Sequence, residues 1–178
     1  MSESDVIIWT KEIFLKWSDF KAESNPSVFE DSHSVIKYRF TWTINSEKID
    51  DQILFLIEDI HLVAEFFPYL SWVRVSQNTD NLLKHEQGHF DLSELVKHEN
   101  IEELQNTFYG KRFPTRGQNE EQQKQFAKED SGRMIALEIE KLEQTLDKRR
   151  EEYDTLTEFG QNSVKQLEYD LMFARLRS

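Results

Sequence analysis

The chain has 178 residues, of which 38% are apolar and 12% aromatic, and it carries a formal charge of −12 at pH 7. This length suits one domain, residues 1–178, with a sizeable core, and the negative charge disfavours nucleic acid and anionic membranes as partners. Because the chain has no cysteine, disulfides, thiolate catalysis and cysteine-bound zinc are excluded, and any metal must be held by imidazole and carboxylate groups.

The N-terminal sequence MSESDVIIWT has no basic start and only a short apolar run, so it does not resemble an intact signal peptide. No apolar run approaches the ~20 residues that span a bilayer. We therefore expect no integral membrane segment and a soluble protein, cytoplasmic unless a leader has been removed. The oligomeric state is not predicted.

Residues 1–77 are predicted to be rich in β-structure. Short aromatic and β-branched runs occur at 6–10 (VIIWT) and 13–20 (IFLKWSDF), and Ser34 to Ile44 alternates as a half-buried strand does. The segment from Gln52 to Phe67 contains enough leucine for a helix, but we interpret it mainly as strand, followed by the strand-like SWVRV at 71–75.

Residues 78–178 are predicted to be helical. A helix is expected from about Asp80 to about His98, with continuation to Phe108 left open, after Asn and Thr residues typical of helix caps. A loop with two glycines and a proline follows at 109–118, and a long helix is expected over about 120–159.

The long helix has a predicted apolar stripe at the helical period, formed by Phe126, Met134, Leu137, Leu142, Leu146, Tyr153 and Leu156. Gly160 is expected to end this helix, and the residues after it to form a last one. With strands first and helices after, the predicted fold class is α+β.

The segment LLKHEQGHFDLSEL places His85 and His89 four residues apart, with Glu86 directly after the first histidine. On a helix both imidazoles lie on one face and can bind one ion, and zinc accepts imidazole nitrogens at about 2.0–2.1 Å. Glu86 is offset beside the ion, where it can take a proton from a metal-activated water and pass it to a leaving amine. This is the chemistry of the H-E-x-x-H motif.

The alternative is that both are ordinary helix histidines, one exposed and one bonded to a carbonyl. The stripe that they share with Leu82, Leu92 and Val96 predicts that both imidazoles point inward, where a metal would satisfy them together. Gly88 costs the helix about 1 kcal/mol, which suggests the close approach of another backbone or of a substrate.

Several segments together resemble a bacterial family known as domain of unknown function nine hundred and twenty-two, regarded as zincin-like, zinc-dependent proteases. The similar residues are Leu15 to Lys21, Ser71 to Val73, Leu82 to Leu92 with the specific HEQGHFD sequence, Tyr153 to Gly160, and Gln166. Their order and approximate spacing match the family over nearly its whole length.

The resemblance implies a zincin-like fold in which a small N-terminal sheet packs against the active-site helix and a second long helix. It also implies zinc as the cofactor, His85 and His89 as its ligands, and Glu86 as the general base. Many members of the family look exported.

The third ligand is not given by the resemblance. The family motif has Tyr-Asp, two residues, Thr, one residue and His-Gly, but Phe159 occupies the histidine position here, and a phenyl ring cannot bind zinc. Glu158 is our candidate for the third ligand, with Asp154 on the same helix face as a second possibility and a solvated surface acid as the alternative for Glu158.

Other histidines and polar residues fit the site less well. His98 lies about half a turn away from His89 on a straight helix, and His33 and His61 are expected to be strand histidines. Asp91 is a candidate to orient a ligand histidine, with a surface role as the alternative, and Tyr153 a candidate to stabilise an oxyanion.

The sequence therefore supports two hypotheses. The first is a zinc-dependent metallopeptidase that acts on a peptide or protein substrate through a metal-activated water. The second, based on Phe159, is a zincin-like binding or regulatory domain that has lost its third zinc ligand and is not an enzyme.

Overall fold

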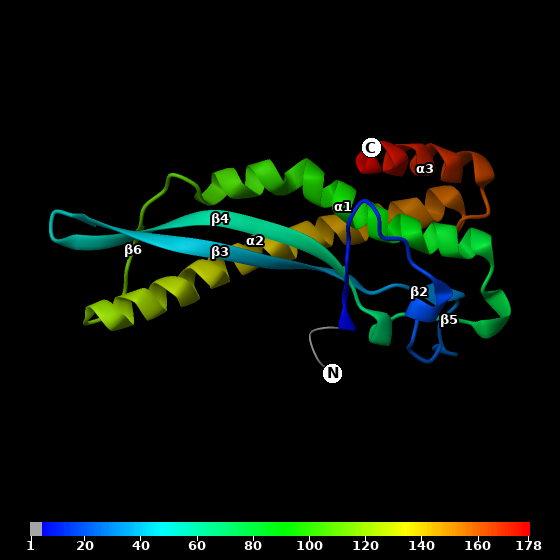
Figure 1. Cartoon of the computed structure of the whole chain (residues 1–178), viewed down its shortest axis with the longest axis horizontal. Coiled ribbons are helices and arrows are strands. Elements are labelled where there is room, and N and C mark those ends of the chain that lie inside the picture. Colours follow the sequence, from blue (N-terminus) through cyan, green and yellow to red (C-terminus); the bar gives the residue numbers. More distant parts are fainter. Residues whose placement is uncertain (1–4) are drawn as a thin grey trace.

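A long β-hairpin with two long helices beside it forms the body of the molecule in the computed structural model, which describes residues 5–178 (Figure 1). Strands β3 (Ile36–Ile49) and β4 (Gln52–Phe66) pair antiparallel along their whole length. Asp50 and Asp51 connect them with positive φ angles, which suits a tight hairpin turn and which aspartate tolerates better than most residues.

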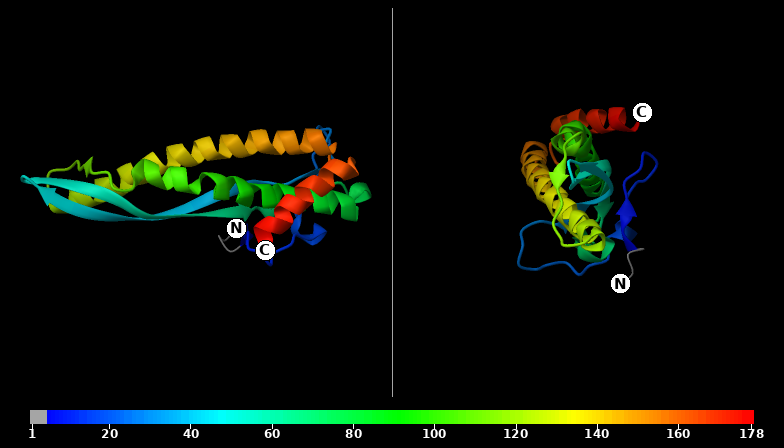
Figure 2. Two further views of the ribbon diagram at one scale, coloured as in Figure 1. Left: turned by 90° about the horizontal axis from the view of Figure 1, so that it is seen from above. Right: turned by 90° about the vertical axis from the view of Figure 1, so that its left-hand side faces the viewer.

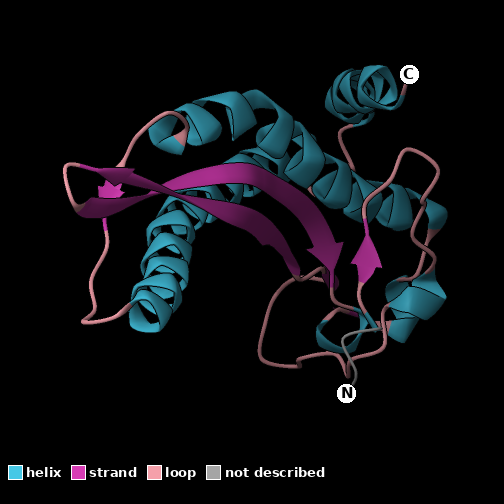
Figure 3. Ribbon diagram, turned by 60° about the vertical axis from the view of Figure 1, so that its left-hand side comes forward, coloured by secondary structure: helices cyan, strands magenta, loops and turns pink. Residues whose placement is uncertain are grey.

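Four shorter strands complete the β-structure of residues 5–178. Strands β1 (Ile7–Ile8) and β6 (Phe113–Pro114) both pair with β4, at its two opposite ends. Strands β2 (Ser32–His33) and β5 (Trp72–Val73) form a separate pair. This pair lies far from the hairpin turn, at the same end of the molecule as the C-terminal helix (Figures 1 and 3).

The helices are α1 (Asp80–Phe108), α2 (Glu120–Thr157) and α3 (Ser163–Arg177). Each helix is capped by a side chain that accepts a hydrogen bond from a backbone N–H of the first turn, and the capping residues are Thr79, Asn119 and Asn162 respectively. Helix α1 packs on β4 and on α2, and α2 packs on β3. Helix α3 contacts α1 and α2 at the end away from the hairpin turn (Figure 2). None of these helices is long and apolar enough to cross a membrane.

A β-bulge in β4 keeps the same face of the hairpin buried from end to end. The register advances two residues on β3, from Thr41 to Thr43, while β4 advances three, from His61 to Glu58. The buried apolar residues of β4 are accordingly odd-numbered on one side of the bulge and even-numbered on the other, namely Phe55, Ile57, Ile60, Leu62, Ala64 and Phe66. The extra residue re-aims the strand so that both halves face the helices.

The predicted α+β class is confirmed. The ambiguous segment 52–67 is strand, and the first helix continues to Phe108. The prediction of β-structure at 13–20 is wrong, because this segment is irregular with a short 3₁₀ turn at Trp17–Asp19. Its apolar side chains Leu15 and Phe20 are buried in the core, so the apolar run reflects packing without a strand.

The predicted stripe of α2 is partly wrong, because Leu137 and Leu156 are exposed. The buried face contains residues that the stripe omitted, namely Ala127, Ser131, Ile135, Ile139 and Thr157. Trp42 of β3 explains why small residues occupy positions 131 and 132 of α2. Its indole N–H donates to the Ser131 hydroxyl over 2.8 Å, and its ring lies 3.0 Å from the position of a Cβ at Gly132.

Candidate metal centre

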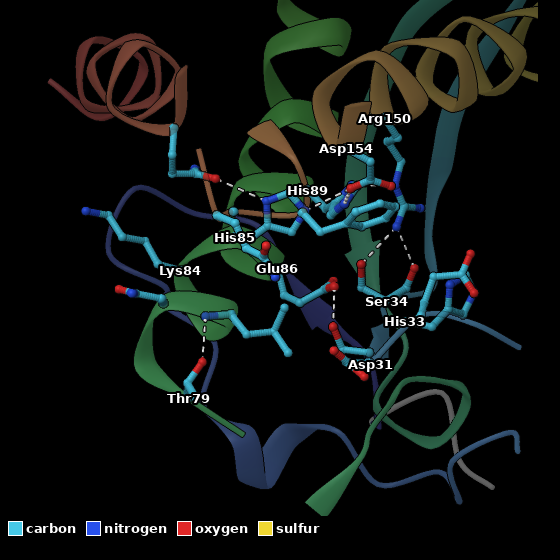
Figure 4. Close-up of a pocket in the computed structure, with 18 of the residues that line it drawn as sticks. Asp31, His33, Ser34, Thr79, Lys84, His85, Glu86, His89, Arg150 and Asp154 are labelled. Carbon is cyan, nitrogen blue, oxygen red and sulfur yellow. Dashed lines mark hydrogen bonds and ion pairs between the residues drawn. The ribbon is translucent and has the colours of Figure 1, made fainter. Parts of the chain in front are cut away.

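Two histidines of α1 and one aspartate of α2 converge at the end of the molecule away from the hairpin turn. The Nε2 atoms of His85 and His89 lie 2.8 and 2.6 Å from Oδ1 of Asp154. Both histidines are buried and Asp154 is partly buried. One ligand atom from each residue lies within 4.8 Å of the other two, so the three could hold a metal ion (Figure 4).

The carboxylate in this group is Asp154, and Glu158 is not part of it. Helix α2 ends at Thr157, and Glu158 is its C-cap with a positive φ angle, so the chain leaves the helix before Glu158 can face α1. Its side chain is exposed. Asp154 lies one turn earlier on the face of α2 that packs against α1. Our first choice of third ligand therefore differs from the residue that the structure brings to the histidines.

Phe159, at the position of the family's histidine, lies at the rim of the site. Its ring centroid is 6.4 Å from that of His85, its side chain is 49% exposed, and its φ is positive like that of Glu158. Gly160 comes closer, since a Cβ there would lie 3.0 Å from Cβ of His85. The turn after α2 thus packs on His85 through a glycine.

His85 is held with its Nε2 lone pair toward Asp154. The amide nitrogen of Gln166 in α3 donates to the Tyr153 hydroxyl and to Asp170, which leaves the Gln166 oxygen to accept from His85 Nδ1 over 3.1 Å. With the proton on Nδ1, Nε2 and the Asp154 oxygen are two acceptors only 2.8 Å apart. A metal ion bound between these two acceptors would satisfy both.

His89 has the opposite arrangement. Nε of Arg150 donates to His89 Nδ1 over 3.0 Å, so the proton of the neutral ring lies on Nε2 and is donated to Asp154. Burial and the nearby Arg150 charge both lower the pKa of His89. The two histidines therefore differ as metal ligands, because Nε2 of the neutral His85 ring carries no proton, whereas His89 must first move its proton from Nε2 to Nδ1.

Asp154 is ionised. Burial opposes its charge, but the close contacts with His85 and His89 outweigh this and hold the pKa of the carboxyl group well below its usual range. A tetrahedral zinc ion with bonds of about 2.0–2.1 Å separates neighbouring ligand atoms by roughly 3.3 Å. The pairs formed by Asp154 with His85 and His89, at 2.8 and 2.6 Å, would have to open by about 0.5 and 0.7 Å respectively to admit an ion.

Glu86 lies beside this group with one carboxylate oxygen available. Its Oε1 accepts a 2.6 Å hydrogen bond from the Ser32 hydroxyl of β2, whereas its buried Oε2 has no hydrogen-bond partner in residues 5–178. Burial opposes its charge, but His89, the Ser32 hydrogen bond and His85 lower the pKa of Glu86 overall. A buried carboxylate oxygen without a donor is rare in folded proteins, and it is suited to receive a proton or a water molecule.

A cleft of about 1080 Å³ opens over these residues. Residues 29–34 of the β2 region form part of its wall, the start of α1 another part, and α2 and α3 the rest, with His85, Glu86, His89, Arg150 and Asp154 all on its lining (Figure 4). The site is therefore reachable from solvent, as a site for a substrate must be.

The structure assigns other roles to three residues singled out in the sequence. Tyr153 stacks on His85 with ring centroids 4.5 Å apart, and its hydroxyl donates to the His85 carbonyl, so the expected oxyanion role is wrong. Gly88 admits that hydroxyl, which lies 2.0 Å from where a Cβ would be. Asp91 accepts hydrogen bonds from Trp9, Gln87 and Arg177 and orients neither histidine, although it is buried.

The remaining histidines stay outside the group of ligands. His33 and His61 are exposed strand residues, as expected, and His98 is exposed on α1. His33 borders the cleft, where partial loss of hydration and the Arg150 charge lower its pKa. Sequence reasoning missed Arg150 and Ser32, and only the spacing of four between Arg150 and Asp154 signalled that the two share a helix face.

No family model, no curated protein and no solved structure matches this chain in the three comparisons made. The resemblance to the zincin-like family stays a prediction.

Proposed function

We propose that the protein is a zinc-dependent hydrolase of peptide or amide bonds, with His85, His89 and Asp154 as metal ligands and Glu86 as the proton acceptor. The observation that carries the proposal is the convergence of three ligand atoms beside a buried carboxylate oxygen that has no partner in residues 5–178. Two imidazoles and one carboxylate form an accepted catalytic zinc set, which leaves a position for water.

Zinc in such a set would polarise a carbonyl group and lower the pKa of a bound water toward about 7. Glu86 then takes one proton from the attacking water through Oε2. The water oxygen forms a bond to the carbonyl carbon, and the π electrons move to the carbonyl oxygen. When these electrons return, the C–N bond breaks, and Glu86 delivers its proton to the amine nitrogen. Ser32 fixes the carboxylate by holding its other oxygen.

The matched pair Glu86→Gln and Glu151→Gln tests this function. Both residues border the cleft, but Glu151 is exposed on α2 and is not part of the group of ligands. Zinc-loaded wild type is expected to release peptides from fluorescein-labelled casein. Glu86→Gln should keep one zinc per chain and lose cleavage by more than about 100-fold, whereas Glu151→Gln should cleave like wild type. Full cleavage by Glu86→Gln would refute the assignment of Glu86.

One observation favours a second candidate function, a binding domain without catalysis. His89 Nδ1 accepts a hydrogen bond from Arg150, and His89 Nε2 donates one to Asp154, so both ring nitrogens have a partner without any ion. Under this alternative the purified protein stays metal-free at micromolar free zinc and cleaves no peptide.

A further inference from the structure

Arg150 is a partly buried cation that forms no ion pair with any residue of the described chain, 5–178. Its Nε donates to His89 Nδ1 over 3.0 Å, and its Nη2 donates to the carbonyl and hydroxyl oxygens of Ser34 over 2.7 and 2.9 Å. Within residues 5–178 no carboxylate pairs with it, although Glu86 and Asp154 attract it through space. An arginine removed from water usually has such a partner, and Arg150 borders the cleft instead.

The hydrogen bond between Arg150 and His89 is incompatible with a metal on His89 Nε2. A neutral imidazole has one donor and one acceptor nitrogen. If Nε2 binds an ion, the ring proton must lie on Nδ1, and it would then face the N–H of Arg150 Nε, donor against donor. Loading of the site therefore requires Arg150 to release His89. The two bonds to Ser34 can keep the guanidinium at the cleft while Nε becomes available.

We propose that Arg150 is a catalytic residue that releases His89 when the metal site fills and then stabilises the negative charge on the substrate's carbonyl oxygen. This inference rests on the proposed hydrolase function. A guanidinium group presents several N–H donors in one plane and is suited to an anionic oxygen. It keeps its charge throughout and gains or loses no proton, so the proton balance set by Glu86 is unchanged.

A carboxylate of the substrate would offer Arg150 the same chemistry as the carbonyl oxyanion. The two are separable by kinetics, because stabilisation of the oxyanion acts in the transition state and changes kcat. Recognition of a terminal carboxylate would instead change KM, and only for peptides with a free C-terminus. Peptides with free and amidated C-termini therefore form the two arms of the experiment.

The test compares Arg150→Met with Arg149→Met. Arg149 is the adjacent residue, and its replacement changes the net charge by the same amount. It pairs with Glu99 and is not among the residues that line the cleft, so it serves as the control. Zinc affinity is measured by competition with a chelator, and kcat and KM with fluorogenic peptides. Arg150→Met should bind zinc about 10-fold more tightly and lose about 10²- to 10³-fold in kcat on both kinds of peptide. Arg149→Met should match wild type in both.

Tighter zinc binding together with a lower kcat separates this role from a structural one. A merely damaged site would bind zinc more weakly and also turn over more slowly. Weaker zinc binding by folded Arg150→Met, or an unchanged kcat, would overturn the proposal, and a KM effect confined to free C-termini would replace the oxyanion with a substrate carboxylate. Should Arg150→Met fail to fold, Arg150→Lys, which keeps the charge and loses the planar donors, should still lower kcat. Wild type that holds zinc and cleaves nothing would refute the hydrolase function, while the zinc affinity of Arg150→Met still decides whether Arg150 competes with the metal.

Discussion

At the scale of single residues, the candidate site depends on groups whose charge state is set by burial and by one another. His89 is buried beside a guanidinium, and both features lower its pKa below the ordinary value of a histidine. Glu86 and Asp154 also have lowered pKa values, with the nearby histidines among the causes that overcome burial. All three groups bind protons less readily in the folded chain than in the unfolded chain.

This predicts a loss of stability in acid. For each group the stabilising contribution is present above the unfolded pKa and is lost as pH falls, because the unfolded chain then binds more protons. For His89 the loss begins as pH falls through about 6.5, and for the carboxyl groups only below about 4.5. The metal-free protein should therefore unfold at a lower temperature at pH 5.5 than at pH 7.5. His89→Gln should flatten this change, whereas exposed His98→Gln should keep it.

The predictability of these residues from sequence was uneven. The spacing of His85, Glu86 and His89 sufficed to place them together, because residues four apart on a helix lie on one face and Glu86 directly follows the first histidine. Glu158 was the first choice of carboxylate because it precedes Phe159 on a helix expected to continue to residue 159, and Asp154, which the structure brings to the histidines, was the second possibility. Helix α2 ends at Thr157 instead, and Glu158 and Phe159, both with positive φ angles, belong to the turn that follows it.

At the scale of elements, Tyr153 and Gly88 lock α1 and α2 together behind the site. The Tyr153 hydroxyl donates to the carbonyl of His85 and accepts from Gln166 of α3, so one side chain joins three helices. It reaches that carbonyl only because residue 88 has no Cβ. The sequence signalled this close approach through Gly88 but did not identify the approaching group.

This contact predicts that Gly88→Ala is destabilising although alanine favours helices. The new methyl group would lie 2.0 Å from the Tyr153 hydroxyl and 2.7 Å from the adjacent ring carbon, so Tyr153 must leave its place beside His85. We expect a loss of about 1–3 kcal/mol in the free energy of unfolding, measured by urea denaturation. Asn106→Ala on the exposed side of α1 is the control and should be neutral or slightly stabilising. An equally stable Gly88→Ala would show that α1 and α2 do not pack this closely.

Strand boundaries were less predictable than helices for a physical reason. The bulge between Thr41 and Thr43 shifts the alternation of β4, so no single period describes its buried residues. Leu15 and Phe20 are buried without belonging to a strand, since burial requires only apolar contact and not a particular backbone. Long helices with capping residues, by contrast, follow from local signals.

At the scale of the whole molecule, the candidate centre joins parts of the chain that are far apart in sequence. The ligand atoms come from α1 and α2, Glu86 is held by β2, and Gln166 comes from α3. A metal that binds only this assembled arrangement should raise the unfolding temperature of the entire chain. The body of the hairpin, at the other end, contributes no residue to the group of ligands among residues 5–178.

The most direct measurement of the central claim is a zinc titration of the metal-free protein, with Asp154→Ala and Glu158→Gln measured in parallel. Wild type and Glu158→Gln are expected to bind one zinc ion per chain with the same affinity. Asp154→Ala should bind it more than about 100-fold more weakly. Wild type that takes up no zinc at micromolar free metal, or an Asp154→Ala variant with unchanged affinity, would contradict a metal centre formed by His85, His89 and Asp154.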